Sequence, residues 1–483
     1  MALFTSKLRL NSPFIMVIFG VSGDLTRRKL VPALFDLYNG SFLPDKFTIL
    51  GFARREWTRE DMIREAGSEI QKRSNIDQNK LNQFFTHFDY LQGNFDEPTD
   101  YPKLALKIEK LDSAIGKSGR RLFYLATPAE NYPDILEGIK QAKLEQPSKV
   151  ENGWTRVVIE KPFGRDLASS KLLNLSLRKI FHENQIYRID HYLAKETAQN
   201  IMTFRFANAL FEPVWKSNYI ERIEIDMFES IGVGTRGNFY ERTGAMRDVV
   251  QNHLMQLMAL VTMDQPNAST ADAFRDSRTR LLEAVRCFDV NHLGRNVVLG
   301  QYASYRREEH VAPASTTETF ASVRVEIDTQ RWSGVPIFLT TGKMMGRTLT
   351  QIRVAYKNAP ASVYELPMDL NHNVLTFDIQ PKEGIGLQLL AKQPGYGHDI
   401  VPVNMHFSYS ENFPAPSIDA YARLLLDALD GDQTLFTRSD EVAAEWTFVD
   451  SIISRVQEHM LQPQIYEDGS DGPAGLKSLL ASV

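Results

Sequence analysis

Short apolar runs alternate with helical stretches through the first 190 residues, and this alternation limits the possible folds more than any other feature. Residues 14–19, FIMVIF, are expected to form a buried strand, followed by glycines and by a helix through Leu34, Phe35 and Leu37. Further strands are predicted at 47–53, 121–126, 156–160 and 185–190. Strands separated by helices need crossover connections, so the pattern predicts a parallel, doubly wound sheet.

Two local signals concern the helices of this region. The run Thr58-Arg59-Glu60-Asp61 has the form of a capping box at the start of a helix. Pro32 falls early in the first predicted helix, where its missing N–H is expected to kink the helix.

Beyond about residue 200 the pattern becomes one of short alternating stretches, at 222–228, 319–327, 335–340, 351–356, 374–379 and 386–390. Alternation of this kind predicts a mainly antiparallel sheet with one covered face. Helical blocks are expected near 244–262 and 417–428. We place the division between the two domains after residue 190, which gives a dinucleotide-binding domain at 1–190 and a substrate-binding domain at 191–483.

Composition narrows the class of protein. A net charge of −5 on a 483-residue chain argues against nucleic acid as the main partner, because no overall positive field would neutralise phosphates. Cys287 is the single cysteine, so no internal disulfide can form. No run of 18 apolar residues exists, and the start of the chain, with Lys7 and Arg9, lacks the apolar stretch of a secretory signal. We therefore expect a cytoplasmic enzyme without a membrane partner.

The segment Gly20-Val21-Ser22-Gly23-Asp24-Leu25 lies between the first predicted strand and its helix. Small residues there allow a dinucleotide's pyrophosphate to approach a helix N-terminus. The segment does not meet the strict G-x-G-x-x-G pattern, and two such glycines after a strand more often form a plain tight turn. Its place at the first strand–helix junction favours a cofactor loop.

Two arginines, Arg54 and Arg55, follow the second predicted strand, where an NAD-binding fold usually has an acidic residue. Guanidinium groups there suit a 2′-phosphate, so the sequence predicts NADP as the cofactor. A solvated arginine pair is the alternative. Glu56, the first acid after them, leaves NAD open as a poorer cofactor.

The segment RIDHYLAKE (188–196) places Asp190 and His191 at the carboxyl end of a predicted strand, where open α/β sheets bind ligands. If a helix starts there, His191 and Lys195 lie four apart on one face and form a partly cationic clamp for a phosphate. An interdomain salt-bridge cluster is an equal alternative from spacing alone.

Other candidate residues are weaker. Asp248 and His253 are five apart, a poor spacing for one face of an α-helix, and a lone histidine there is more often a core or cap residue. Thr341-Gly342-Lys343 is not a P-loop, because Ile337 and Met344 occupy required positions. Lys343 could contact a phosphate or lie on the surface. The ten histidines show no metal-ligand spacing, so no metal site is expected.

Six segments together resemble the successive signature blocks of the glucose-6-phosphate dehydrogenase family: GVSGDLTRRKL (20–30), EKPFG (160–164), RIDHYLAKE (188–196), FRFANALFEPVW (204–215), RDVVQNHLMQ (247–256) and FTRSDEVAAEW (436–446). They occur in the family's order and span most of the chain. The resemblance implies an N-terminal Rossmann-like domain, a larger domain on an antiparallel sheet with helices, and an active site between them. It also implies a dimer interface on the sheet face, in a homodimer or homotetramer.

By this resemblance the chain would oxidise glucose 6-phosphate at C1 to the lactone with NADP, the first step of the oxidative pentose phosphate pathway. His253 would be the general base, and Asp190 would orient it. The substrate-binding residues would be Lys29, Lys161, His191, Tyr192, Lys195, Glu229, Asp248, Lys343 and Arg347. The cofactor would be bound by Gly20, Ser22, Gly23, Asp24, Leu25, Arg54 and Lys161.

The chain departs from the family's pattern at Thr348, where a second Lys or Arg is usual. Arg347 could replace that charge, or phosphate affinity could be weaker. Thr348 therefore leaves open a dehydrogenase for another sugar phosphate or for free glucose. A catalytically silent NADP-binding subunit is a second alternative, opposed by the intact set of Asp190, His191, Lys195 and His253.

Overall fold

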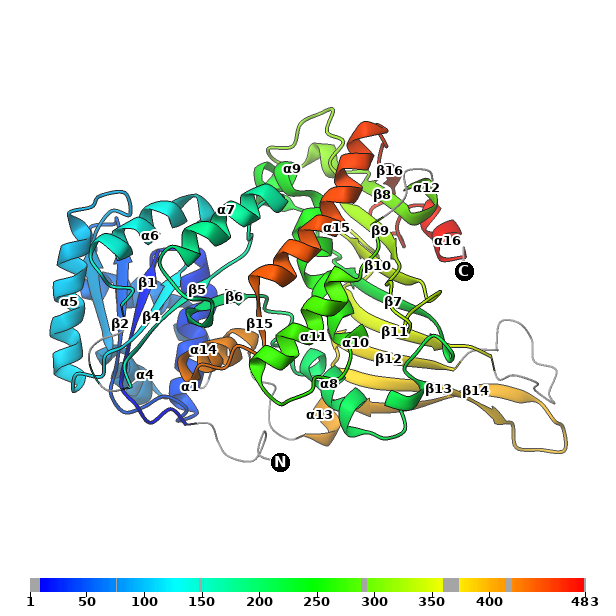
Figure 1. Cartoon of the computed structure of the whole chain (residues 1–483), viewed down its shortest axis with the longest axis horizontal. Coiled ribbons are helices and arrows are strands. Elements are labelled where there is room, and N and C mark those ends of the chain that lie inside the picture. The colour runs from blue at the N-terminus through cyan, green and yellow to red at the C-terminus, as the bar shows by residue number, and fades with distance from the viewer. Residues whose placement is uncertain are drawn as a thin grey trace.

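The computed structural model describes residues 9–74, 76–146, 150, 152–287, 293–358, 373–413 and 419–481. Two sheets lie side by side with helices between them (Figure 1). Lys7 and the first two residues of the predicted helical block 417–428 lie outside the described residues.

The first sheet has the strand order β15-β6-β5-β4-β1-β2-β3. Its six parallel strands are β1 Phe14–Phe19, β2 Phe47–Ala53, β3 Phe88–Gln92, β4 Arg120–Leu125, β5 Trp154–Ile159 and β6 Ile186–Ile189. Strand β15, Phe436–Thr437, pairs antiparallel with β6. The chain order reverses at β1, which lies between β2 and β4, and such a reversal is where open α/β sheets bind dinucleotides. The predicted doubly wound parallel sheet is confirmed.

Helices cover both faces of this sheet (Figure 1). They are η1 Thr26–Leu30, α1 Val31–Asn39, α2 Arg59–Ala66, α3 Ser68–Gln71, α4 Gln78–Thr86, α5 Asp100–Ile115, η2 Ala129–Asn131, α6 Tyr132–Gln141, α7 Leu167–Arg178 and η3 Glu183–Gln185. Burial on both faces explains why β1 is apolar throughout, with every residue at most 1% exposed.

The two local signals in this region had different outcomes. The capping box is confirmed: Thr58 Oγ1 accepts from Asp61 N at 3.1 Å, and Thr58 N donates to Asp61 Oδ2 at 3.0 Å. Pro32 lies in the first turn of α1, where its missing N–H is tolerated. The turn before it, η1, is a π-helix, so the irregularity takes the form of a widened turn instead of a kink.

The second sheet has the order β14-β13-β12-β11-β7-β10-β9-β8-β16. Its strands are β7 Ile220–Phe228, β8 Val297–Tyr302, β9 Phe320–Val325, β10 Ile337–Gly342, β11 Leu349–Tyr356, β12 Val374–Gln380, β13 Gly384–Lys392, β14 Ile400–Ser408 and β16 Gln464–Tyr466. All neighbours are antiparallel except β7 with β10 and β8 with β16. The predicted mainly antiparallel sheet is confirmed.

The helices of the second part lie largely on the side of its sheet that faces the first (Figure 1). They are α8 Glu196–Ala207, η4 Glu212–Val214, η5 Gly234–Arg236, α9 Gly237–Ala245, η6 Met246–Leu254, α10 Met255–Thr262, α11 Ala271–Glu283, α12 Leu293–Asn296, η8 Tyr305–Arg307, α13 Tyr409–Asn412, α14 Ala420–Asp430, α15 Ser439–Glu458 and α16 Gly475–Leu480. Every residue of α10 is buried, as expected for a helix between two sheets.

The predicted helical block at 244–262 is not one regular helix. Gly244 has φ of 66° and ψ of 174°, and a Cβ there would collide with the Glu318 carboxylate, so the chain breaks at a glycine. The next nine residues form the π-helix η6, and α10 continues from Met255.

Late segments of the chain return to the first sheet. The Arg156 guanidinium on β5 donates to the carbonyl oxygens of Ala428 and Leu429 at 2.8 and 2.7 Å. Gln433 Nε2 donates to the Ile186 carbonyl at 2.9 Å. These bonds and strand β15 join the two parts closely. Within the described residues, no helix is long and apolar enough to cross a membrane.

Candidate active site

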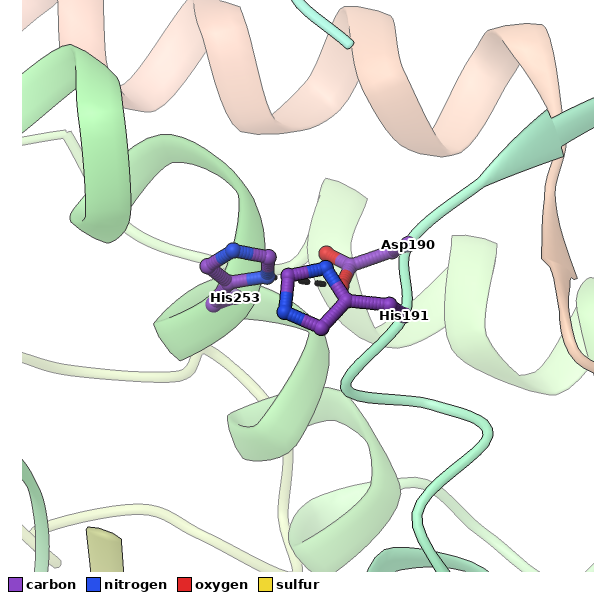
Figure 2. Close-up of side chains that lie close together, drawn as sticks. All are labelled: Asp190, His191 and His253. Carbon is purple, nitrogen blue, oxygen red and sulfur yellow. Dashed lines mark hydrogen bonds and ion pairs between the residues drawn. The ribbon is translucent and has the colours of Figure 1, made fainter. Parts of the chain in front are cut away.

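A buried histidine–carboxylate pair lies between the two sheets. Asp190 directly follows β6, and His253 comes from η6; their side chains are 2% and 5% exposed. His253 Nδ1 and Asp190 Oδ1 are 2.6 Å apart (Figure 2). Tyr192 N also donates to Asp190 Oδ1, at 3.0 Å. Asp190 thus fixes one ring nitrogen of His253 and leaves Nε2 for chemistry.

The π-helix corrects the argument about spacing. Asp248 and His253 are five apart, which is unfavourable in an α-helix, but η6 closes i to i+5 hydrogen bonds. Its wider turn brings residues five apart near one face, and the charge of Asp248 acts on both His253 and Lys161. The argument from spacing assumed 3.6 residues per turn, which does not hold in η6.

Lys161, just after β5, brings positive charge to the other nitrogen of His253. Its Nζ contacts His253 Nε2 and lies 3.4 Å from Asn252 Oδ1. Burial lowers the pKa of His253, Asp190 opposes that shift and Lys161 adds to it. Burial tends to raise the pKa of Asp190, but His253 and Lys161 hold it well below its usual range. At neutral pH the pair is therefore a neutral imidazole beside a carboxylate, suited to accept a proton at Nε2.

Asp190, His191 and His253 carry potential metal-ligand atoms within 4.8 Å of one another, a grouping that the sequence did not indicate (Figure 2). His253 Nδ1 is already bonded to Asp190, and the Lys161 ammonium lies against Nε2. A cation beside Nε2 would repel a metal ion, so this arrangement favours acid–base chemistry.

A cavity of about 520 Å³ opens beside the pair. It is lined by Lys29, His191, Tyr192, Lys195, Gln380, Glu383, Asp419, Ala420 and Tyr421. Lys195 Nζ lies 5.0 Å from the centre of the Tyr192 ring. Burial is the main cause that lowers the pKa of Lys195 to about 8, with Glu383 opposing and Lys29 adding to the shift. Four of the predicted substrate-binding residues thus line one cavity.

The helix expected to carry both His191 and Lys195 does not do so. Residues 191–194 form turns, and α8 begins only at Glu196. The two residues nevertheless line the same cavity, because the turns fold back after Asp190 through the bond from Leu193 N to Asp190 O, 3.2 Å.

Lys343 and Glu229 form a separate pair. Lys343 Nζ contacts Glu229 Oε2 and lies 5.3 Å from the centre of the Tyr240 ring. The charges of Glu229 and Asp248 both act on Lys161, so this pair borders the same region. Neither Lys343 nor Arg347 lines the cavity that contains Lys195. Arg347 is exposed.

Thr348 has partners of its own. Its Oγ1 accepts from Ser230 N at 3.1 Å and lies 2.8 Å from Ser230 Oγ. The residue that stands in place of the family's second basic residue therefore fastens the Lys343 loop to the end of β7.

A second cavity, of about 720 Å³, lies at the carboxyl ends of β1, β2 and β4. Gly20, Ser22, Gly23 and Arg54 line it. Gly20 has φ of 83°, and a Cβ there would lie 2.7 Å from the Ala126 carbonyl oxygen, so only glycine permits this close approach. The volume is within the usual range for a cofactor site, and the residues fit a dinucleotide.

Other predicted cofactor residues lie differently. Asp24 forms exposed ion pairs with Arg27 and Arg28, at 2.6 and 2.9 Å, and Leu25 packs against the apolar core. Their side chains do not line the larger cavity. Arg55 lines an adjoining cavity of about 290 Å³, with its guanidinium 5.2 Å from the Trp57 ring centre.

Sequence reasoning missed two residues near the pair. Glu160 is half-buried next to Lys161 and bonded by the Tyr124 hydroxyl, and desolvation raises its pKa to about 7. The sequence offered one indication of Glu160, an acidic residue directly after an apolar strand. Tyr421 lines the lysine cavity and stacks 6.2 Å from His191. Nothing local could have placed it there, because it lies 230 residues further along the chain.

A dinucleotide-sized cavity on a doubly wound sheet, together with a buried histidine–aspartate pair after one of its strands, is the arrangement of a nicotinamide-dependent oxidoreductase. Two family models match: the NAD binding domain of glucose-6-phosphate dehydrogenase at residues 17–200 and its C-terminal domain at residues 202–483. The chain belongs to the glucose-6-phosphate dehydrogenase family.

Individual relatives agree along the whole length. Glucose-6-phosphate 1-dehydrogenase 2 of Mycobacterium tuberculosis is 40% identical, covering 98% of this chain and 94% of the relative. Glucose-6-phosphate 1-dehydrogenase of Bacillus subtilis is 38% identical, covering 96% of each. A solved glucose-6-phosphate dehydrogenase in complex with glucose 6-phosphate superimposes with a TM-score of 0.90 at 32% identity, covering 98% of each chain.

Proposed function

We propose that this protein oxidises glucose 6-phosphate at C1 to 6-phosphoglucono-1,5-lactone with NADP as hydride acceptor, the first step of the oxidative pentose phosphate pathway. The observation that carries the proposal is the buried His253–Asp190 pair, which lies beside a cavity lined by lysines. The full-length similarity to enzymes named for this substrate supports it.

In this reaction His253 Nε2 accepts the proton of the C1 hydroxyl, and Asp190 stabilises the imidazolium that forms. Lys161 contacts Nε2 in the free protein and must give way there to the C1 hydroxyl; its charge keeps the imidazole neutral beforehand and stabilises negative charge developing on the sugar oxygen. Glu229 and Asp248 hold sugar hydroxyls. The bound nicotinamide supplies the hydride acceptor at its C4.

The 6-phosphate binds in the lysine-lined cavity. His191, Tyr192 and Lys195 donate to it, and Lys29 adds positive charge from η1. Lys343 is held by Glu229 in the free protein, so its contact with the phosphate requires exchange of that partner. These roles follow the family's motif positions and are proposals for this chain.

NADP is the preferred cofactor and NAD a poorer one. Arg54 lines the dinucleotide cavity at the end of β2, where a 2′-phosphate would lie. Arg54→Ala should weaken NADP binding more than NAD binding, because only NADP carries the extra phosphate. Equal losses for both cofactors, measured by KM, would reject this role.

The active form is a homodimer, or a homotetramer built from it, in the cytoplasm. Strands β7 and β11 of the second sheet carry the charged group Arg222, Glu224 and Arg353, on the face opposite to the core residues Ile223 and Ile225. Glu224 accepts from both arginines at 2.7 and 2.9 Å. Light scattering should give at least twice the chain mass of 55.0 kDa. A monomer at assay concentrations would reject this part of the proposal.

One assay tests the function. Reduced nicotinamide is measured with glucose 6-phosphate, free glucose and mannose 6-phosphate, each with NADP. We expect the highest kcat/KM with glucose 6-phosphate. Preference for another sugar would indicate a related dehydrogenase, and no reduction with any of them a silent relative.

A further inference from the structure

Buried polar side chains join η6, which carries His253, to the long helix α15, the faint orange helix above the site in Figure 2. Glu445 Oε1 accepts from Gln256 Nε2 at 2.6 Å, and its Oε2 accepts from Gln251 Nε2 at 3.3 Å. These three residues are at most 5% exposed. The Glu445 carboxyl group on α15 therefore forms hydrogen bonds with one residue before His253 and one residue after it.

The same helix is anchored one turn earlier. Glu441 receives Arg278 Nε at 2.8 Å and Nη2 at 3.3 Å, and both side chains are fully buried. Gln256 Nε2 also lies 3.4 Å from Glu441 Oε2. A two-point ion pair of this kind fixes α15, so the position of Glu445 is set independently of η6.

The contact depends on the winding of η6. Gln251 and Gln256 are five residues apart, and in an α-helix they would point about 140° apart, too far to meet one carboxyl group. Gln251 lies in η6 and Gln256 is the second residue of α10, and the widened turn at the end of η6 brings both to Glu445. Asp248 and His253 have the same offset, so the winding that satisfies Glu445 also sets those two side chains.

The pKa of Glu445 is consistent with a residue that only holds its neighbours in place. Burial, then the charge of Glu441, raises the pKa of Glu445 well above its usual range, and Asp190 contributes. A carboxyl group that binds a proton more readily than usual tolerates replacement by an amide of the same shape.

We propose that Glu445 is a positioning residue that holds the π-helical turn of η6, through Gln251 and Gln256, in the form that aligns His253. Its kinetic consequence rests on the proposed function, whereas its effect on η6 does not.

The test compares Glu445→Ala with Glu445→Gln, which keeps the shape and one acceptor oxygen. Its NH2 group can donate to Gln256 Oε1, a buried oxygen without a hydrogen-bond partner among the described residues, once the Gln256 amide turns over. Asp450→Ala is the matched control, because Asp450 lies on α15 but accepts from Leu167 N at the start of α7, at 2.7 Å. Hydrogen exchange of peptides covering 246–254 is measured for each variant, together with kcat and KM.

Glu445→Ala should speed exchange in 246–254 and lower kcat ten- to a hundredfold with little change in KM, since misplacement of a catalytic group acts on the chemical step. Glu445→Gln should restore both, and Asp450→Ala should change neither. Unchanged exchange in Glu445→Ala, or unchanged kcat, would overturn the proposal.

If Glu445→Ala does not fold, Gln251→Met removes one arm and should give a smaller change of the same kind; wild-type exchange would then overturn the proposal. If the wild type does not oxidise glucose 6-phosphate, the proposed function fails, and the exchange comparison decides the role of Glu445 alone.

Discussion

The proposed role of His253 as a general base depends on whether the neighbouring groups keep its imidazole ring neutral. Burial and the Lys161 ammonium favour the neutral ring, whereas Asp190 favours the charged one. The net effect is a lowered pKa, so His253 stays ready to accept a proton over a wide range of pH. The Nδ1 contact with Asp190 directs that proton to Nε2.

His253→Asn should lower kcat by about 10²–10⁴-fold with little change in KM, because the base is lost and the phosphate contacts remain. Asp190→Asn should show a smaller loss with the same pattern. Near-normal kcat in the His253 variant, measured by steady-state kinetics, would remove this residue from the mechanism.

The pH profile gives a second test of the pair. The acid limb of kcat/KM should lie below the ordinary histidine pKa of about 6.5, since the pKa of His253 is lowered. Asp190 favours the charged ring, so Asp190→Asn should lower that pKa further and move the limb to lower pH. Movement to higher pH would contradict this arrangement.

Lys195→Ala should lower kcat/KM for glucose 6-phosphate by roughly one to two orders of magnitude, the effect of losing a charge-assisted hydrogen bond. The low rate with free glucose should hardly change. Because the pKa of Lys195 is about 8, kcat/KM for the phosphate ester should decline as pH rises through that value.

Lys195→Arg is the control for that decline, because a guanidinium stays charged and should extend the profile to higher pH. If Lys195→Ala leaves the selectivity for phosphorylated over free glucose unchanged, the phosphate does not bind at this residue.

Variants of Arg347 and Thr348 test whether Arg347 supplies the positive charge that the family usually has at position 348. Thr348 is bonded to Ser230, whereas Arg347 is an exposed cation of the same loop. If it reaches the phosphate, Arg347→Ala should behave as a milder Lys195→Ala, and Thr348→Lys should add little. A silent Arg347→Ala together with a lower KM in Thr348→Lys would show that the charge is missing.

Candidate site residues could be identified from the sequence only where a local pattern indicated their place in the fold. Asp190 and His191 follow a recognisable strand, so position alone indicated them. His253 gave no such signal, because the π-helical winding of η6, which carries it, leaves no mark in apolar periodicity. The family's motifs were needed to single it out.

At the scale of elements, hydrogen bonds from residues 466–470 hold the loop that carries Lys343. Tyr466 OH on β16 donates to the Lys343 carbonyl at 2.6 Å. Gly469 N donates to Met344 O at 2.7 Å, and Gly346 N to Ser470 O at 2.9 Å. A short edge strand and the turn after it therefore fix the loop that carries Lys343.

Tyr466→Phe should raise KM for glucose 6-phosphate a few-fold and leave kcat nearly unchanged, because one net hydrogen bond contributes about 0.5–1.5 kcal/mol. Tyr305→Phe is the control, since it removes a bond of the same kind, 2.7 Å to Glu241, within the same aromatic cluster. Equal changes of KM in both variants would mean that the loop is not held by Tyr466.

Several elements with a clear local pattern were predicted, but the strands β8 and β14 were missed, as were elements that depend on their neighbours. The apolar run of β1 and the alternation of β12 are visible locally. Strand β3, FDYLQ, is half polar, and β15 has two residues. Both form because an existing sheet edge pairs with them, which no local pattern shows.

At the scale of the molecule, segments from the second half of the chain form part of the first sheet and bond to it. Strand β15 completes the first sheet from a segment nearly 250 residues beyond β6, and Gln433 bonds β6 beside it. Separations of this size are invisible in the sequence, so the division after residue 190 did not foresee that residues 420–437 lie against the first sheet. The division itself stays a prediction.

This interlocking predicts how the whole chain unfolds. Loss of β15 and of the bonds between Arg156 and α14 would expose the edge of the first sheet, so neither part can unfold without weakening the other. Calorimetry should therefore show one transition. NADP at about 100 times its Kd should stabilise that whole transition by about 2.7 kcal/mol, and Arg54→Ala should remove most of the gain at the same concentration. Two resolved transitions, with only one shifted by NADP, would show that the parts unfold independently.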